Sequence, residues 1–218
     1  MYSQDIIDRF KKVATASVAD ACDQIVGRRC FMDYEMKARI NDKRVVGPAV
    51  TILEGPAAGE NVGPTHAIDA IEGAAEGDVL VISLANADKN VALWGGIMTA
   101  GAYSKGMAGA ILDGGVRDTT EIKRDYGFQV YARSVSPGTT LGRYKTYAAN
   151  VPVTCADVSV NPGDLIVADP DGVVVVPADK VEAVLAATEE IEAKEALQAK
   201  LIVESKSIKE GLAKYNRI

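Results

Sequence analysis

The stretch "WGGIMTAGAYSKGMAGAILDGGVRD", residues 94–118, decides the fold of this chain. Residues 94–107 have a glycine-rich start and helical character, and "AGAILDGG", residues 108–115, is a short apolar run closed by a turn. The pattern predicts a helix followed by a buried strand, a unit that is typical of α/β proteins. Two opposite charges, Arg117 and Asp118, follow directly after that strand.

The residues upstream continue this alternation of helix and strand. "RVVGPAVTILEG", residues 44–55, has a β-branched composition interrupted by Gly47 and Pro48, which indicates a bent or edge strand. "PTHAIDAIEGAA", residues 64–75, repeats apolar positions at helical period. "VLVISLA", residues 79–85, is a continuous apolar run of strand length, so one helix and one buried strand are expected here.

The downstream half is predicted to be rich in strands. A short helix through Ile122 precedes the strand-like "FQVYARSV", residues 128–135. The turns "NPGD" and "DPDG" then divide two further strands, because proline, glycine and aspartate favour turn conformations.

Helices are expected at both ends of the chain. Residues 3–13 carry apolar side chains at helical spacing, and Ser17, with an acid three residues on, indicates the start of a second helix. Residues 178–204 form a long run of helix formers with one apolar stripe, and this helix is long enough to reach a neighbouring subunit. We therefore predict one α/β domain over 1–218, in which 178–218 is a helical extension.

Composition and charge exclude several classes of protein. The 218 residues are 48% hydrophobic and carry a net charge of −6, so a packed core is expected and a basic surface for nucleic acid is not. The amino terminus mixes charge into every turn, which favours a cytoplasmic protein with no signal peptide or membrane span. Cys22, Cys30 and Cys155 have unpatterned spacings and are interpreted as small buried hydrophobes.

The candidate site lies at the two ends of the opening stretch. Gly95 and Gly96 open a helix whose unpaired amides could bind a carboxylate or phosphate, although glycines also serve close packing. Arg117 could clamp a carboxylate, and Asp118 could bind a hard divalent cation. The alternatives are a surface ion pair between them, or Asp118 as the N-cap of "TTEIKRD". The residues alone leave both interpretations open.

Other catalytic classes find little support in the sequence. His66 is the only histidine, which excludes a two-histidine metal motif. Lys105 is the only candidate for a Schiff base, and its glycine-flanked position favours a solvent-facing side chain. The glycine-rich stretches contain no dinucleotide-binding fingerprint after a strand.

Ordered motifs along the chain resemble one known family. They are "VVGPAVTI", "EGDVLVI", "GMAGAILDGGVRD" and "VNPGDLIVADPDGVVVVP", with twenty residues between Gly96 and Arg117–Asp118 and with Glu121 three residues after Asp118. This pattern resembles the RraA-like family, which contains regulator of RNase E activity A and class II 4-hydroxy-4-methyl-2-oxoglutarate aldolases. The resemblance implies a swivelling β/β/α fold and a homotrimer or homohexamer with active sites between subunits.

The resemblance also implies roles for single residues. Arg117 and the amides of Gly95, Gly96, Ile97 and Met98 would hold the carboxylate of a pyruvoyl group. Asp118 would bind Mg²⁺ or Mn²⁺, supported by a glutamate from the C-terminal helix of the next subunit. Counting forward from Pro177 places Glu195 in that role, with Glu192 as the nearby alternative. His66 matches a substrate-binding position, while a helical histidine bonded to a neighbour is an equal alternative.

One departure from the aldolase pattern concerns Gly96. The aldolases have an acid there that helps to orient the catalytic base, and glycine has no such group. Retro-aldol cleavage needs both a base and a group that stabilises the enolate, whereas oxaloacetate decarboxylation needs mainly the second. We interpret Glu121 as a first-turn helix carboxylate rather than a replacement for that acid.

Two functions therefore remain open. The first is a metal-dependent lyase that acts on a small 2-oxo acid, by decarboxylation, retro-aldol cleavage or both. The alternative is a non-catalytic regulatory module that binds protein partners, as the RNase E regulators do. Asp118 and the long C-terminal helix favour the enzyme, whereas Gly96 is shared with the regulators.

Overall fold

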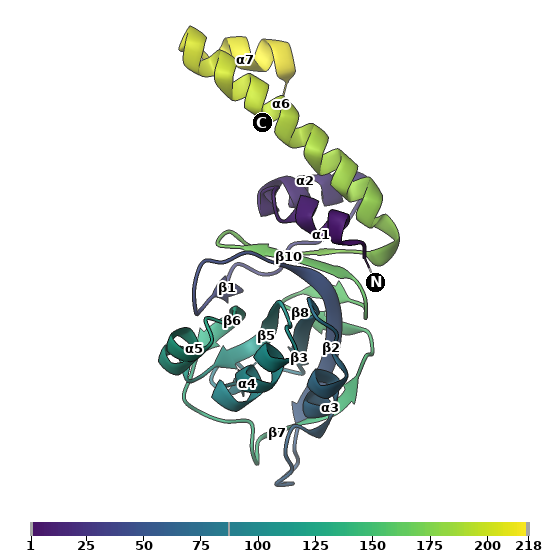
Figure 1. Cartoon of the computed structure of the whole chain (residues 1–218), viewed down its shortest axis with the longest axis vertical. Helices are drawn as coiled ribbons and strands as arrows, with labels where there is room; N and C mark the ends of the chain where they lie inside the picture. The colour runs from purple at the N-terminus through teal and green to yellow at the C-terminus, as the bar shows by residue number, and fades with distance from the viewer. Residues whose placement is uncertain (1, 87, 217–218) are drawn as a thin grey trace.

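The computed structural model describes residues 2–86 and 88–216, and these form the mixed α/β architecture expected from the sequence (Figure 1). The helices are α1 (Gln4–Phe10), α2 (Thr15–Ile25), α3 (Thr65–Gly73), α4 (Gly96–Ser104), α5 (Thr119–Asp125), α6 (Val181–Ser205) and α7 (Ile208–Tyr215). The main sheet comprises β1 (Lys37–Ala38), β2 (Val45–Pro56), β3 (Val79–Leu84), β4 (Ala92–Trp94), β5 (Gly109–Val116), β6 (Val130–Val135), β7 (Tyr144–Ala149), β10 (Leu165–Asp169) and β11 (Gly172–Val176). A separate hairpin consists of β8 (Val153–Cys155) and β9 (Val158–Val160).

The main sheet has the strand order β1-β6-β5-β3-β2-β10-β11. Strands β6, β5, β3 and β2 are parallel neighbours, whereas β10 and β11 continue the sheet in antiparallel fashion. Phe31 forms an isolated bridge to Val174 of β11, which brings the segment before β1 close to the opposite end of the sheet. The sheet is therefore nearly closed, as the swivelling β/β/α fold requires.

Strand β2 is a central strand rather than an edge strand. It pairs with β3 along one side, and with β10 and then β7 along the other. A Cβ atom at Gly47 would lie 2.0 Å from the carbonyl oxygen of Gly77, so glycine is needed for this close approach. The glycine and proline that indicated a bent or edge strand therefore mark the region where β2 bends between two partners.

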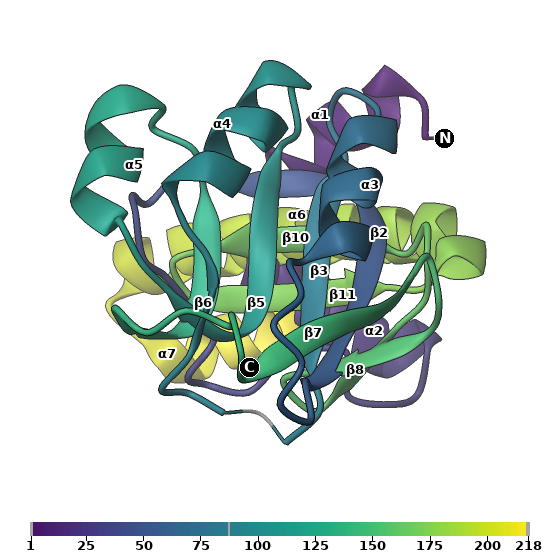
Figure 2. The same cartoon turned by 90° about the horizontal axis from the view of Figure 1, so that it is seen from below.

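Three apolar clusters hold the layers together. One lies between the sheet and helices α3, α4 and α5, and includes Ile71, Trp94 and Ile122. A second fills the space between the sheet and the β8–β9 hairpin. The third joins β10 and β11 to α1, α2 and the first half of α6, where the predicted stripe is buried: Val181, Val184, Leu185, Thr188 and Ile191. Figures 1 and 2 show α6 on the opposite side of the molecule from α3, α4 and α5.

Helix α2 begins two residues earlier than expected, at Thr15 rather than Ser17. Its start carries no side-chain cap of its own. The amide of Ala14 instead donates a hydrogen bond of 2.5 Å to Glu192 Oε1 of α6, and the amide of Thr15 donates one of 3.1 Å to Asp169 Oδ2. Carboxylates remote in sequence thus satisfy the first amides of the helix, which local capping rules do not predict.

Several elements differ from the sequence predictions. The expected helix over 94–107 is shorter, because Trp94 ends β4 and Gly95 is the N-cap of α4. Strands β1, β4, β7, β8 and β9 were not predicted, helix α7 lies within the predicted helical extension, and a 3₁₀ turn over Ala178–Lys180 precedes α6. Within the described residues, every helix is too short or too polar to cross a lipid bilayer.

Candidate functional site

The candidate site forms where the start of α4 meets the end of β5. The amide of Arg117 donates to the carbonyl oxygen of Trp94 at 2.9 Å, which joins the ends of β4 and β5. The Trp94 indole donates to Thr99 Oγ1 at 2.7 Å, and the Thr99 hydroxyl donates to the Gly95 carbonyl at 3.0 Å. These buried contacts fix the first turn of α4 against the strand that carries Arg117.

Asp118 connects the two elements through its side chain. Its Oδ2 accepts a hydrogen bond of 2.9 Å from the amide of Gly96 and lies 3.7 Å from Arg117 Nε. Asp118 is also the N-cap of α5 by position, because its carbonyl accepts from the amide of Ile122 at 2.9 Å. Its side chain, however, makes no capping bond in α5. The ion pair with Arg117 and the N-cap position at α5 are therefore both present in part, and neither of these contacts involves Oδ1.

The two glycines at the start of α4 have different roles. A Cβ atom at Gly95 would lie 2.7 Å from Asp118 Oδ2 and 3.0 Å from Arg117 Nε, so any larger residue would displace the charged pair. At Gly96 the nearest atom would be Asp118 Oδ2 at 3.6 Å, an ordinary contact. Gly95 is thus required for close packing, whereas position 96 has space for a side chain beside Asp118.

The amides of Ile97 and Met98 are the donors that remain at the helix start. Thr99 donates its amide to the Gly95 carbonyl and Gly96 donates to Asp118. Among the described residues, no acceptor is bonded to the amides of Ile97 and Met98, as is usual in the first turn of a helix. The helix dipole adds partial positive charge at this end, so the start of α4 favours an anion.

A pocket of about 450 Å³ opens beside these groups. Four of the predicted residues line it: Gly95, Ile97, Met98 and Arg117. Gly96 and Asp118 do not line it themselves, but the 2.9 Å bond between them places Asp118 next to Gly95 at its edge. Three further lining residues were not predicted from the sequence, and they come from the loop between β6 and β7: Thr139, Thr140 and Leu141. No sequence signal relates that loop to α4, because the two meet only in the folded chain.

His66 lies outside the lining of this pocket. It is exposed at the start of α3, where its amide donates to Thr146 Oγ1 at 3.1 Å and its Nδ1 lies 3.2 Å from the same oxygen. This contact matches the structural alternative for His66, a helical histidine bonded to a neighbour. Within one chain, the structure does not bring His66 to Arg117.

Glu54 is a buried carboxyl that the sequence analysis did not single out. It lies on β2 directly opposite Thr146 on β7, is 1% exposed, and its Oε2 has no hydrogen-bond partner in the described structure. Burial raises the pKa of Glu54 to about 7. The only sequence signal was an acid inside an apolar strand, which a half-exposed strand would also contain.

The two candidate glutamates of α6 have different surroundings. Glu192 is engaged inside the chain, because its Oε1 accepts the Ala14 amide. Glu195 is exposed one turn further along the helix, beyond the last residue that packs on the body, Ile191. Neither side chain reaches Asp118 within one chain, because α6 packs against α1, α2 and α7 on the far side of the sheet (Figure 1).

The donor set at Asp118 fits a metal that a substrate helps to bind. Within the residues that the structure describes, no three histidine, cysteine or acidic side chains cluster to form a metal cage. Mg²⁺, however, is commonly held by one or two carboxylates, with water and substrate oxygens as the other ligands. Asp118 is about 43% exposed, is oriented by Gly96 and has Oδ1 outside its present contacts, so it suits that role.

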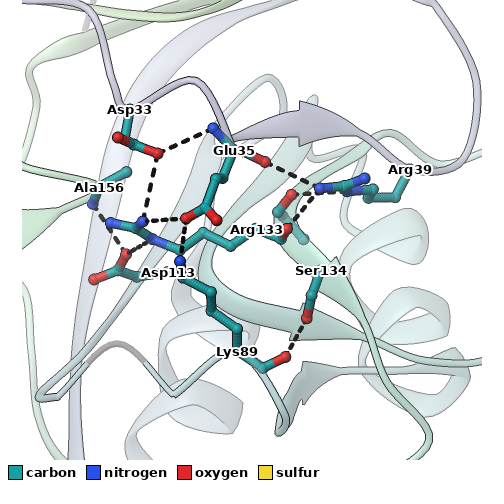
Figure 3. Close-up of polar contacts among 9 residues, drawn as sticks. Asp33, Glu35, Arg39, Lys89, Asp113, Arg133, Ser134 and Ala156 are labelled. Atoms are coloured by element: carbon teal, nitrogen blue, oxygen red, sulfur yellow. Dashed lines mark hydrogen bonds and ion pairs between the residues drawn. The ribbon is translucent and has the colours of Figure 1, made fainter.

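A second charged cluster lies on the other face of the sheet (Figure 3). Arg133 of β6 donates to Asp113 Oδ1 at 2.6 Å and to Glu35 Oε2 at 3.0 Å, and Lys89 forms an ion pair with the same glutamate. Burial raises the pKa of the Asp113 carboxyl, and the bonds to Arg133 partly offset that effect. Asp113 and Arg133 also line a cavity of about 510 Å³. Because the charges compensate one another inside the chain, we interpret this cluster as structural.

The fold and the site together define an α/β protein with an arginine and an aspartate at the carboxyl edge of its sheet. A family model described as RraA-like, Aldolase/RraA, matches residues 15–175. The chain therefore belongs to the RraA-like family, as the sequence motifs indicated.

Individual relatives support this membership. A protein from Halalkalibacterium halodurans that is named as a 4-hydroxy-4-methyl-2-oxoglutarate aldolase is 34% identical over 184 residues, which are 83% of this chain and 80% of that protein. A solved structure of an uncharacterised protein from Pseudomonas syringae pv. tomato matches with a TM-score of 0.87 at 25% identity, over 98% of this chain and 95% of that one. RraAS2 of Streptomyces coelicolor, described as an unusual member of the RNase ES inhibitor RraA protein family, has a TM-score of 0.80 at 26% identity, over 91% and 97%.

Proposed function

We propose that this chain is a divalent-metal-dependent lyase that cleaves carbon–carbon bonds in small 2-oxo acids and releases pyruvate. The observation that carries the proposal is the convergence of Arg117, the Ile97 and Met98 amides and Asp118 at one edge of a pocket. The name of the Halalkalibacterium relative supports the same class of reaction.

Arg117 and the start of α4 would hold the substrate carboxylate. The guanidinium offers paired donors that match a carboxylate, and it is about 42% exposed, so it is accessible from the pocket. The amides of Ile97 and Met98 add two fixed donors at the positive end of the helix dipole. Together they neutralise the acid and direct its 2-oxo group towards Asp118.

Asp118 would hold the metal, Mg²⁺ or Mn²⁺. The bound ion would polarise the 2-oxo group and stabilise the negative charge that develops as the bond breaks. The amide of Gly96 orients the Asp118 carboxylate, so this metal ligand would be in place before the substrate arrives. Glu195 would support the metal from a second subunit, because α6 does not reach the site of its own chain. We therefore propose a homotrimer or homohexamer with shared sites.

The lack of an acidic side chain at Gly96 affects which reaction the site can catalyse, retro-aldol cleavage or decarboxylation. Position 96 faces Asp118 at contact distance, so an acid there would stand beside the metal ligand, and this chain has none. Retro-aldol cleavage requires removal of the 4-hydroxyl proton, whereas decarboxylation of oxaloacetate does not. We propose that decarboxylation proceeds readily, and that aldol cleavage relies on a water molecule or another group as base.

The test is metal-dependent pyruvate release from oxaloacetate by the purified protein and by Asp118→Ala. Mn²⁺ affinity, measured by calorimetry in the presence of the inert 2-oxo acid analogue oxalate, provides a readout besides activity. We expect Asp118→Ala to lose both turnover and Mn²⁺ binding while circular dichroism and the unfolding midpoint stay unchanged. Equal turnover in both proteins would contradict the role of Asp118.

A second candidate function is a regulatory module that binds a protein partner. The similarity to RraAS2 and the glycine at position 96 favour it. Absence of metal-dependent turnover on every 2-oxo acid, together with binding of an RNase E-type ribonuclease, would support this alternative.

A further inference from the structure

The charges that line the pocket restrict the ligand that it can take. Among the described lining residues, Arg117 is the one cationic side chain and Glu72 the one anionic side chain. The Ile97 and Met98 amides lie at the same end as Arg117, on the first turn of α4. The pocket therefore provides positive potential at one end only, which is enough for one carboxylate.

Nearby cations do not provide a second carboxylate site. Lys105 Nζ donates to the Glu72 carbonyl at 2.6 Å and lies 3.8 Å from Glu72 Oε2. Arg143 donates to the Thr139 carbonyl at 3.0 Å, and neither cation is among the lining residues. Both are engaged with the outer wall of the pocket rather than directed to its interior.

The remaining wall of the pocket is mainly apolar, and its neutral polar side chains are Thr139 and Thr140. The apolar part comprises Val62, Ile68, Ile71, Leu93, Met98 and Leu141. At about 450 Å³ the pocket lies within the size range of small-molecule sites, and it extends well beyond a pyruvoyl group. A carboxylate against the apolar part of this wall would lose hydration without gaining a cationic partner, whereas a hydrocarbon group would gain by burial.

We propose that the preferred substrate of this chain for aldol cleavage is a 4-hydroxy-2-oxo acid with a single carboxylate and an apolar substituent at C4. This inference rests on the proposed function and concerns the substrate class of the same site. In the cleavage of a 4-hydroxy-2-oxo acid, the C3–C4 bond breaks and its electron pair moves to C3, which later takes up a proton to give pyruvate. The 4-hydroxyl loses its proton and becomes the carbonyl of the second product, a ketone or aldehyde whose alkyl group contacts the apolar wall.

The apolar wall has exposed side chains, which a second copy of this chain could also cover. Val62, Ile68, Ile97 and Leu141 are 41%, 49%, 89% and 48% exposed, and all four line the pocket. A substrate tail is favoured because the wall continues directly from Arg117 and the helix amides, which anchor the acid end. The alternative occupant is distinguishable by experiment.

A matched pair of substrates tests the inference with the full-length protein. 4-Hydroxy-4-methyl-2-oxoglutarate and 4-hydroxy-4,5-dimethyl-2-oxohexanoate differ only in a distal carboxylate replaced by an isopropyl group of similar shape. We expect kcat/KM for pyruvate release to be about 10- to 100-fold higher for the isopropyl compound. A preference for the dicarboxylate would overturn the inference while leaving the proposed lyase function in place.

Two uncleavable acids test the same point without turnover. With Mg²⁺ present, 5-methyl-2-oxohexanoate should bind at least tenfold more tightly than 2-oxoglutarate in calorimetry. This measurement remains decisive if neither matched substrate is cleaved, a result that would contradict aldol cleavage and leave oxaloacetate decarboxylation to its own test. Equal affinities, tighter binding of 2-oxoglutarate, or no binding of either acid would overturn the substrate class.

A third test introduces a charged side chain into the apolar wall. Leu141→Arg should shift the preference towards the dicarboxylate by at least tenfold, whereas Leu141→Met, which keeps the wall apolar, should retain the original preference. Leu141 lies on an exposed loop, so both variants are expected to fold. If Leu141→Arg changed the mass of the oligomer in light scattering and left the substrate preference unchanged, a second copy would cover the wall. That result would overturn the inference.

Discussion

The amide of Gly96 donates a 2.9 Å hydrogen bond to Asp118 Oδ2, and this contact joins the start of α4 to the end of β5. It holds the proposed metal ligand beside the helix amides that would bind the substrate acid. Its geometry also explains why two adjacent glycines are not equivalent, since only at Gly95 would an added Cβ atom lie within 3.0 Å of both charged side chains.

Alanine substitutions at the two glycines should have different effects. A Cβ atom at Gly95 would lie 2.7 Å from Asp118 Oδ2, so Gly95→Ala is expected to displace the aspartate and reduce kcat/KM for pyruvate release about 100-fold. At Gly96 the nearest atom is 3.6 Å away, so Gly96→Ala should stay within about threefold of the wild type. Steady-state kinetics on oxaloacetate provide the comparison, and equal effects would contradict this packing argument.

Arg117→Lys should raise KM more than it lowers kcat. The carboxylate that Arg117 would bind does not react, so its binding energy is the same in ground and transition states. Loss of the paired donors should raise KM about 10- to 100-fold, because hydrogen bonds to charged groups contribute about 1.5–3 kcal/mol. A large fall in kcat at unchanged KM would indicate that Arg117 acts in the bond-breaking step instead.

The free energy of unfolding should fall as pH rises, because the buried Glu54 carboxyl holds its proton more tightly in the folded chain than in the unfolded chain. Burial raises its pKa from 4.5 to about 7, so between these values the folded chain keeps a proton that the unfolded chain has lost. The free energy of unfolding should therefore decrease from pH 5 to pH 8 by up to about 3 kcal/mol from this group. Urea unfolding of the wild type and of Glu54→Gln tests this, since the glutamine variant should lose most of the decrease. An unchanged pH profile in Glu54→Gln would rule out Glu54 as the cause.

Substitutions of the two α6 glutamates should affect different properties, stability at Glu192 and metal activation at Glu195. Glu192→Ala removes the acceptor for the Ala14 amide and should cost about 1 kcal/mol of unfolding free energy, with the Mn²⁺ requirement unchanged. Glu195→Ala should raise the Mn²⁺ concentration for half-maximal activity about tenfold. The reverse result, with metal activation weakened only by Glu192→Ala, would exchange the two assignments.

The Arg133 cluster should behave as a buried ion network. Arg133→Met leaves the Asp113 carboxylate, about 7% exposed, without its main partner and should cost about 3–5 kcal/mol. Replacing both residues, as Arg133→Met with Asp113→Leu, should recover part of that loss because no buried charge is then unpaired. Denaturant unfolding of the two variants measures the difference, and a double variant less stable than the single one would contradict the interpretation.

Much of the fold could be predicted because its signals are local. The apolar runs that became β3 and β5 and the stripe of α6 bury the residues that their periodicity indicated. Strand β4 has only three residues, and β7 alternates weakly, so neither carried a clear pattern. The start of α2 was misplaced because its capping carboxylates come from Asp169 and Glu192, more than 150 residues away.

The candidate site was predictable in part for the same reason. Arg117 and Asp118 directly follow β5, and Gly95 and Gly96 stand at the start of α4, the helix that precedes β5. Both pairs were therefore visible in one stretch of sequence. The loop residues Thr139 to Leu141 and the buried Glu54 reach their places through strand pairing, which one sequence does not encode locally. Position 66 matched the family pattern, yet its side chain contacts Thr146 outside the pocket.

The most direct measurement is pyruvate release from oxaloacetate and from 4-hydroxy-4-methyl-2-oxoglutarate, side by side, with Mg²⁺, with Mn²⁺ and with chelator. We expect metal-dependent turnover that chelator abolishes, and faster turnover of oxaloacetate because Gly96 provides no base for the 4-hydroxyl proton. Metal-independent release, or no release from either acid while the matched isopropyl substrate is also inert, would contradict the assignment of a metal-dependent 2-oxo acid lyase.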